Sequence, residues 1–165
     1  MKKDAIDEIL EQWSAQRPEL DTAGLGVVIR IMSLYKSCKL QATQALEPLG
    51  LELFEYDVLS ALRRQGKPFA LAATILAKET GLSAGAMTNR VDKLAMRGLV
   101  QRHREDRDRR AVLVSLTSKG RRVIDEAIRL RLHAADESLR NLSAKERHDL
   151  AKLLRKALVG GKRPD

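Results

Sequence analysis

The sequence predicts a mainly α-helical fold that contains one small β-hairpin. Three observations support this prediction. Apolar residues recur at helical spacing near both ends of the chain, a glycine-containing turn separates two short helices in the middle, and a β-branched run, AVLVSLT, follows a highly charged stretch. The 165 residues are enough for one domain with a substantial core.

Composition excludes several classes of protein. No window reaches the ~18 to 20 uninterrupted apolar residues of a membrane span, and the N-terminus, MKKDAIDEIL, is too polar for a signal peptide. We therefore expect a cytoplasmic protein with no membrane partner. The single Cys38 cannot form an intramolecular disulfide, and the three histidines show no metal-ligand spacing. We expect neither a metal nor a cofactor.

Positive charge is concentrated in the second half of the chain. Residues 1–80 carry 10 basic and 11 acidic side chains, whereas residues 81–165 carry 21 and 11, so the net charge changes from −1 to +10. A one-sided basic surface attracts phosphate backbones, but it also attracts membranes and acidic proteins. Charge alone therefore makes nucleic acid one candidate partner among several.

Three helices are expected before residue 65. The first carries an apolar stripe from Ile6 to Trp13 and ends at RPELD, where Asp21 can cap the next helix. The second runs from about Leu25 to Leu46 and stops near Pro48. The third runs from Leu53 to Arg64 and places one apolar face inward. That face comprises Phe54, Val58, Ala61 and Leu62.

Residues 74–99 predict a helix-turn-helix. Ala77 followed four residues later by Gly81 allows two helices to approach closely, and Ser83 can cap the second helix. The first helix should bury Ile75, Leu76 and Ala77, and the second Met87, Val91 and Leu94. The outward set is short and polar, as base edges and phosphates require, although a solvated face has the same composition. It comprises Gly85, Thr88, Asn89, Asp92, Lys93 and Met96.

The stretch RHREDRDRRAVLVSLTSKG, residues 102–120, predicts two strands joined by a basic loop from Arg104 to Arg110. A hairpin placed directly after such a helix makes a winged helix-turn-helix. Arginines at its tip can enter a narrow minor groove. Asp108 can orient Arg110 or a neighbouring guanidinium by a charge-assisted hydrogen bond.

Two more helices close the chain. Thr117 can cap the first, and Ser143 to Glu146 match a capping box at the start of the second. Each carries an apolar stripe that a single long helix cannot bury. Helices from both chain ends are therefore expected to pack together, and against a second subunit.

Residues 82–120 resemble the winged helix-turn-helix of MarR-type transcriptional regulators. In that family the wing ends in Asp-x-Arg before a strand and LT-x-x-G, as at Asp108, Arg110, Thr117 and Gly120. The resemblance spans about residues 5 to 158. It implies an intertwined homodimer that binds double-stranded DNA at a pseudo-palindromic operator, usually as a repressor released by a small ligand. Residues 1–50 and 117–165 would form dimerisation helices, and residues 51–116 the DNA-binding region. The implied DNA contacts are Ser83, Ala84, Thr88, Asn89, Arg90, Lys93, Arg107, Asp108, Arg109 and Arg110.

The N-terminal EQWSAQRPELD is similar to a MarR subgroup with an extra first helix, in which urate or related aromatic anions bind. That resemblance implies a ligand site formed by Trp13, Asp57, Arg90 and Arg102. Helical geometry agrees for Arg90, which lies about 65° from the inward stripe, where it can face a cleft. A buried arginine needs an acid or an anion, and Asp57 can serve when no ligand is bound. Each of the four also has a purely structural interpretation: core packing for Trp13, an ion pair for Asp57 and Arg90, and a phosphate contact for Arg102.

Two other functions remain open from the sequence. A thiol-based redox switch would act through Cys38, although core packing explains this residue equally simply. A non-regulatory architectural DNA-binding protein would share the basic surface but show weak sequence preference. No nucleophile and base pair, phosphate loop or metal cluster is recognisable, so we do not expect an enzyme.

Overall fold

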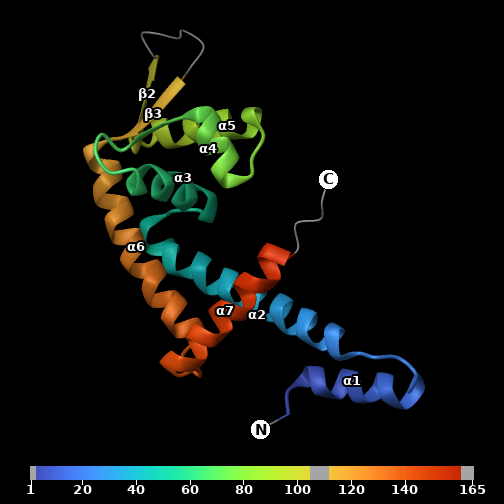
Figure 1. The fold of residues 1–165 in the computed structure, drawn as a ribbon. Helices are drawn as coiled ribbons and strands as arrows, with labels where there is room; N and C mark the ends of the chain where they lie inside the picture. Colours follow the sequence, from blue (N-terminus) through green and yellow to red (C-terminus); the bar gives the residue numbers. More distant parts are fainter. Residues whose placement is uncertain (1–2, 105–111, 161–165) are drawn as a thin grey trace. The chain divides into compact units, whose positions relative to one another are not determined.

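The computed structural model describes residues 3–104 and 112–160. The chain separates into two compact units, residues 1–41 and residues 42–165 (Figure 1). The three-part division expected from the sequence stays a prediction.

The first unit holds two helices, α1 (Ala5–Gln16) and most of α2 (Ala23–Leu46). Asp4 caps α1 by accepting hydrogen bonds from the backbone N–H groups of Ile6 and Asp7, at 2.9 and 3.0 Å. Arg30 of α2 reaches back to α1 and donates to both Asp4 and Asp7, at 2.9 and 2.7 Å. These contacts attach α1 to α2 within the unit.

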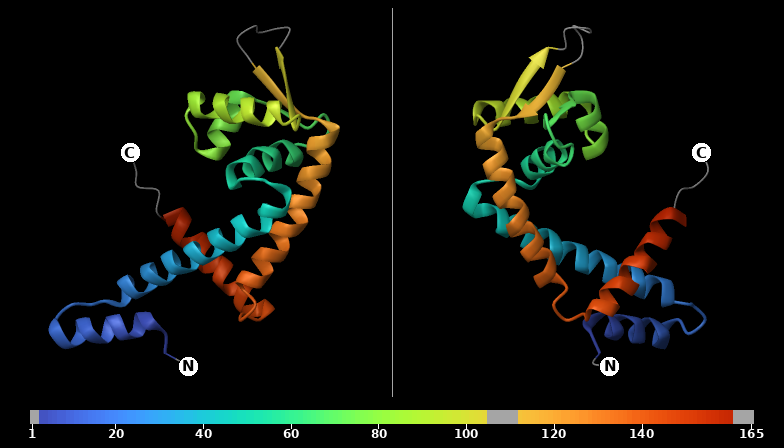
Figure 2. Two further views of the ribbon diagram at one scale, coloured as in Figure 1. Left: turned by 180° about the vertical axis from the view of Figure 1, so that it is seen from behind. Right: turned by 60° about the vertical axis from the view of Figure 1, so that its left-hand side comes forward.

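The second unit contains the remaining elements. Its helical elements are the short 3₁₀ helix η1 (Glu47–Leu49), α3 (Leu53–Arg64), α4 (Ala73–Thr80), α5 (Ala84–Met96), α6 (Ser118–Ser138) and α7 (Ala144–Gly160). Its strands are β1 (Ala70–Ala72), β2 (Val100–Arg104) and β3 (Val112–Leu116). They form an antiparallel sheet in the order β1-β3-β2, with Arg102 opposite Val114 and Leu71 opposite Val114 on the other side (Figure 2).

The predicted fold class is confirmed, with two corrections. The sheet has a third strand, because β1 pairs with β3 and turns the expected hairpin into a three-stranded sheet. Ile75 was expected inside but is 47% exposed, whereas Leu76 and Ala77 are buried. A helix of eight residues presents one narrow inward face, and two adjacent positions fill it here.

The core of the second unit lies between α3, α4, α5, the sheet and the start of α6. Val58 and Leu62 of α3, Met87 and Leu94 of α5 and Ile124 of α6 are each no more than 1% exposed. The inward stripe predicted for residues 84–96 is therefore confirmed. This shared core fixes α5 against α3.

Several apolar side chains remain exposed on helices of both units. On α2 they include Val27, Val28, Met32 and Tyr35, each more than half exposed. On α7 they include Leu153, Leu158 and Val159, at 66%, 78% and 72%. Contiguous apolar surface of this kind is unusual on a monomer. In the part of the chain that the structure describes, no helix is long and apolar enough to cross a membrane.

Candidate DNA-binding surface and effector pocket

Helices α4 and α5 form a close pair joined by a tight turn. Gly81 ends α4 with a φ of +66°, a left-handed conformation that glycine adopts without steric cost. The backbone N–H of Leu82 then donates to the carbonyl of Ala77 at 2.9 Å. Ser83 caps α5 by accepting from the N–H of Ala86 at 3.3 Å. The helix-turn-helix predicted from the sequence is thus formed by the residues expected to form it.

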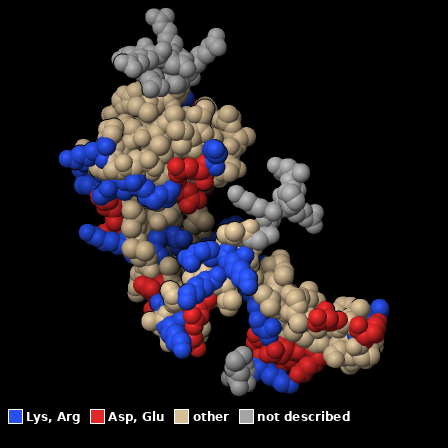
Figure 3. All heavy atoms as spheres, in the orientation of Figure 1, with Lys and Arg blue, Asp and Glu red and all other residues tan. Residues whose placement is uncertain are grey.

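The outer face of α5 is polar and accessible. Among the predicted DNA contacts on this helix, the exposed ones are Ser83, Ala84, Thr88, Asn89 and Lys93. Thr88 donates its hydroxyl to the carbonyl of Ala84, at 3.0 Å, so it leaves an oxygen lone pair outward. Basic side chains are not limited to α5, because Figure 3 shows several groups of them on the visible face of the second unit, with acidic groups between.

Strands β2 and β3 follow α5 directly and form the base of the wing. Arg102 of β2 forms an ion pair with Asp92 of α5, which attaches the wing to the helix beside it. His103 Nε2 lies 2.9 Å from the Ser115 hydroxyl across the strand pair. Residues 105–111 lie outside the described residues, and with them the predicted tip contacts Arg107, Asp108, Arg109 and Arg110.

Two of the expected DNA contacts meet an aromatic ring. The guanidinium carbon of Arg90 lies 4.1 Å from the centroid of the Phe54 ring, and the ammonium of Lys93 lies 5.9 Å from it. Phe54 belongs to the first turn of α3 and is half-buried. Both cations therefore lie on the shoulder of α5 that faces α3 rather than at the centre of its outer face.

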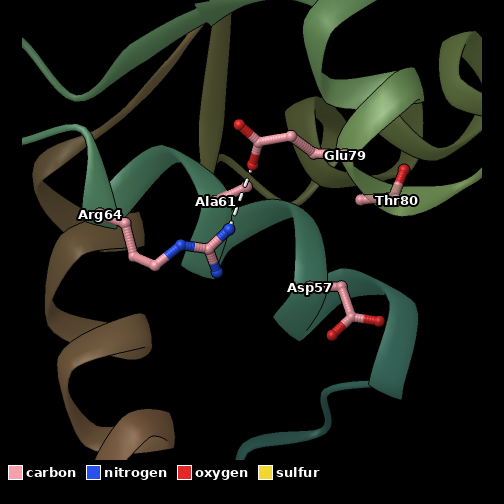
Figure 4. A pocket seen from close by; sticks show the side chains of 5 residues that line it. All are labelled: Asp57, Ala61, Arg64, Glu79 and Thr80. Atoms are coloured by element: carbon pink, nitrogen blue, oxygen red, sulfur yellow. Dashed lines mark hydrogen bonds and ion pairs between the residues drawn. The ribbon is translucent and has the colours of Figure 1, made fainter. Parts of the chain in front are cut away.

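A cavity of about 270 Å³ lies between α3 and α4 (Figure 4). Asp57, Ala61 and Arg64 share one face of α3 by their spacing of four and three residues, and Glu79 and Thr80 line the opposite side from α4. Arg64 Nη2 donates to Glu79 Oε2 at 3.1 Å, so an ion pair joins the two helices across the cavity. Figure 4 shows the Asp57 carboxylate apart from that pair.

The electrostatics at Asp57 combine burial with positive charge. Burial raises the pKa of the Asp57 carboxyl above its usual range, while the charges of Arg131, Arg64 and Arg90 act in the opposite direction. Three arginines thus bear on one partly buried acid. This excess of positive charge favours a second anion near Asp57.

The structure places the four predicted effector contacts as follows. Asp57 lines the cavity, Arg90 stacks on Phe54, and Arg102 pairs with Asp92. Trp13 belongs to α1 in the first unit and is 46% exposed, so its fit to the other three stays a prediction. Among the described residues no ion pair joins Asp57 to Arg90, although the charge of Arg90 reaches that carboxyl. The structural interpretation of these two residues as an ion pair is therefore wrong.

Sequence reasoning missed Phe54, Arg64 and Arg131 as neighbours of this region. The spacing of Asp57, Ala61 and Arg64 was a usable signal for Arg64, because residues four and seven positions apart share a helix face. Phe54 was expected to face the core, and nothing local in the sequence indicates that cations from α5 cover it. Arg131 lies 74 positions after Asp57, so only the tertiary fold brings their charges together.

A close helix pair with a glycine turn, a polar outer face on the second helix and a β-hairpin immediately after it define a winged helix-turn-helix DNA-binding protein. Comparison with known proteins agrees. The chain belongs to the MarR family of transcriptional regulators, and the family's sequence profile matches residues 49–111. It is a DNA-binding regulator and not an enzyme.

Relatives cover most of the chain. It is 31% identical over 137 residues to the multiple antibiotic resistance protein MarR of Escherichia coli, covering 81% of this chain and 90% of the relative. It is 26% identical over 149 residues to the transcriptional regulator PecS of Dickeya dadantii, with 90% of both chains covered. The repressor NicR of Pseudomonas putida is 34% identical over 115 residues, which are 70% of each chain.

Two solved structures extend the comparison. A mutant of Escherichia coli MarR in complex with operator DNA matches with a TM-score of 0.71 and 26% identity, covering 94% of this chain and 99% of that one. Bordetella bronchiseptica BpsR, whose DNA binding is regulated by 6-hydroxynicotinic acid, matches with a TM-score of 0.69 and 27% identity, covering 79% and 97%.

Proposed function

We propose that this regulator is a cytoplasmic homodimer that represses transcription from a pseudo-palindromic operator and is released by a small anionic aromatic effector. Helix α5 reads the major groove, and the wing reaches the adjacent minor groove. The proposed DNA contacts are Ser83, Ala84, Thr88, Asn89, Arg90, Lys93, Arg107, Asp108, Arg109 and Arg110.

The exposed polar face of α5 carries the DNA-reading part of this proposal. Thr88 and Asn89 lie on it side by side, and both side chains suit base edges in the major groove. The likeness to operator-bound Escherichia coli MarR supports the same role for the equivalent helix. Repression is supported by the resemblance to NicR, which is described as a repressor.

The exposed apolar surfaces support the homodimer. Met32 and Tyr35 of α2 are 56% and 61% exposed, and Leu158 of α7 is 78% exposed. Surface of this kind loses free energy in water at roughly 25 cal/mol per Å². A second copy that covers these helices removes that cost and places two α5 helices about 34 Å apart, as two half-sites require.

The charges around Asp57 support an anionic effector. Arg64, Arg90 and Arg131 all act on this one carboxyl, and the Phe54 ring beside Arg90 offers a flat apolar surface. A planar ring that bears a carboxylate or enolate matches both features. The 6-hydroxynicotinic acid that regulates BpsR belongs to this chemical class. In the proposed mechanism the effector replaces Asp57 as the counter-charge of Arg90, shifts α5 and spoils the half-site spacing. Trp13 and Arg102 complete the proposed effector site.

The operator is not needed in advance to test this. Wild-type protein first selects a tight duplex from a random library, and footprinting of the selected duplex defines its half-sites. The labelled complex is then titrated with urate, 6-hydroxynicotinic acid and salicylate, with nicotinamide as an uncharged control. We expect at least one of the anions to release the duplex and nicotinamide to leave it bound.

Asp57→Ala should lower affinity for the selected duplex because it removes the counter-charge of Arg90. Asp125→Asn is a matched control, since Asp125 bonds Arg63 on the opposite side of α3. If no anion releases the duplex and Asp57→Ala binds it as tightly as wild type, the effector part of the proposal is wrong. If no duplex is selected above background, the sequence-specific part is wrong.

A further inference from the structure

Glu55 is a buried carboxylate that the proposed function does not use. It lies in the first turn of α3 and is 3% exposed. Its Oε2 accepts a hydrogen bond from the backbone N–H of Glu52 at 3.0 Å and one from Arg97 Nη1 at 2.6 Å. An ionised side chain at this depth is costly unless it is paired, so the contact to Arg97 is what makes its position favourable.

Arg97 is the residue at which helix α5 ends. Its side chain reaches back to α3 through Glu55, and its backbone carbonyl accepts a hydrogen bond from Lys119 Nζ of α6 at 3.0 Å. One residue at the end of α5 therefore contacts two other helices. The side chain of Arg97 is 36% exposed, while that of its partner Glu55 is 4% exposed.

The two residues after Arg97 are held by the start of α6. The Thr117 hydroxyl donates to the carbonyl of Gly98 at 2.7 Å, and the Thr117 N–H donates to the carbonyl of Leu99 at 3.1 Å. Gly120 packs so closely that a Cβ there would lie 1.9 Å from the Leu99 oxygen. The end of α5, residues 97–99, is thus fixed from two directions, and we call these contacts the C-terminal anchor of α5.

The other end of α5 has no comparable attachment among the described residues. The Ser83 hydroxyl accepts from Ala86, and the Thr88 hydroxyl donates to Ala84, so both side chains bond within their own helix. A rod held at one end transmits a small change there into a larger displacement at the other. The free end is the one that carries Ser83, Ala84 and Thr88.

We propose that Glu55 is a positioning residue for DNA recognition: through its ion pair with Arg97 it sets the direction in which α5 presents its free end to the major groove. This inference rests on the proposed reading of DNA by α5. It assigns to a buried side chain, remote from the DNA-facing surface, part of the control of sequence preference. Base readout tolerates little displacement, whereas phosphate contacts tolerate more, so the loss should fall on specific binding.

Glu55→Gln is the most informative variant. It keeps the shape and an oxygen for the Glu52 N–H, it removes the charge that holds Arg97, and the released guanidinium can reach water because it is part-exposed. Arg97→Gln is harsher, since it leaves Glu55 buried without its partner. Asp125→Asn is the control: its ion pair with Arg63, at 2.6 Å, joins α3 to α6 without touching α5.

The experiment compares binding of the selected duplex with binding of an unrelated duplex at one salt concentration, on protein shown to be folded and dimeric. We expect Glu55→Gln to lose about tenfold or more in affinity for the selected duplex, the loss of one good base contact, and less than about twofold for the unrelated duplex. Asp125→Asn should change neither by more than about twofold. The double variant Glu55→Gln/Arg97→Gln should discriminate between the duplexes no less well than Glu55→Gln alone, because the two residues act as one unit.

A purely structural role would lower the melting temperature and leave the ratio of the two affinities unchanged. Folded Glu55→Gln with a wild-type ratio overturns the proposal, as does an equal fall of the ratio in Asp125→Asn. If Glu55→Gln does not fold, Arg97→Lys takes its place from the half-exposed side, and an unchanged ratio there overturns it too. Asn89→Ala separates the two levels: if it binds the selected duplex like wild type, reading by α5 is itself wrong, and if it binds weakly while Glu55→Gln does not, only the positioning role fails.

Discussion

The guanidinium of Arg90 lies over the ring of Phe54, 4.1 Å from its centroid, and this contact joins the helix that faces DNA to the helix that lines the cavity. Lys93, one turn further along α5, lies 5.9 Å from the same ring. A cation is attracted to the negative face of an aromatic ring. Phe54 therefore holds two side chains that the sequence had assigned to DNA.

Replacement of Phe54 by Leu should lower the free energy of unfolding by about 1 kcal/mol or slightly more. Leucine keeps an apolar side chain at this half-buried position but removes the ring face that attracts Arg90 and Lys93. Urea unfolding followed by circular dichroism measures the change. Phe54→Tyr keeps the ring and should stay close to wild type.

The coupling of Phe54 to Arg90 can be isolated by a double-mutant cycle. Phe54→Leu and Arg90→Gln should cost less together than the sum of their separate costs, because each removes the same contact. Strict additivity would contradict the stacking as an energetic link. Lys93→Gln should couple more weakly, in keeping with its longer distance to the ring.

The ion pair between Arg102 and Asp92 should contribute little to stability and should be sensitive to salt. Both side chains are part-exposed, at 36% and 47%, and such pairs are worth about 0 to 1 kcal/mol. Asp92→Asn should therefore cost less than about 1 kcal/mol at low salt, with the difference from wild type shrinking as salt is added. A cost that is large and unaffected by salt would mean that Asp92 acts by a contact other than this pair.

Local patterns predicted the helix-turn-helix well and the surroundings of Arg90 poorly. The inward stripe Met87, Val91 and Leu94 follows from helical periodicity, and the caps at Ser83 and Thr117 follow from the hydrogen-bonding chemistry of hydroxyl side chains. The position of Arg90 depends instead on Phe54, 36 residues earlier in the chain.

Strand β1 was missed for a related reason. Three residues, Ala70–Ala72, are too short for an alternating pattern, and alanine has little preference for strands. The strand exists because β3 offers it a free edge, with Leu71 opposite Val114. Pairing between segments more than 40 residues apart cannot be read from either segment alone.

Gly120→Ala should be strongly destabilising. A Cβ at this position would lie 1.9 Å from the carbonyl oxygen of Leu99, which is backbone and cannot rotate away. Overpacking of this kind costs about 1 to 3 kcal/mol and occasionally more. Thermal unfolding measures it, with Gly85→Ala as the control, because Gly85 is helical and a Cβ there would meet open space, with no neighbouring group within 4 Å.

Gly85→Ala should be neutral or stabilise by up to about 1 kcal/mol, because alanine is the better helix former. The two variants make the same chemical change, so the difference between them isolates the approach of α6 to residue 99. Equal stability of the two would mean that α6 moves aside freely, contrary to the C-terminal anchor of α5.

The attachment of α1 to α2 should persist at mildly acidic pH and be lost only in strong acid. The hydrogen bond from Arg30 holds the pKa of the Asp4 carboxyl below its ordinary value of 3.8, assisted by the backbone N–H groups of Asp7 and Ile6. A carboxyl whose pKa is lowered on folding contributes stability above its unfolded pKa, and that contribution disappears as pH falls through the folded value. Trp13, the single tryptophan of the chain, lies on α1 and reports the attachment by its fluorescence anisotropy. We expect constant anisotropy from pH 7 to about pH 4 and a fall below. Arg30→Gln should show the low value at every pH, whereas a variant that keeps the wild-type anisotropy at pH 7 would show that apolar packing alone holds α1 in place.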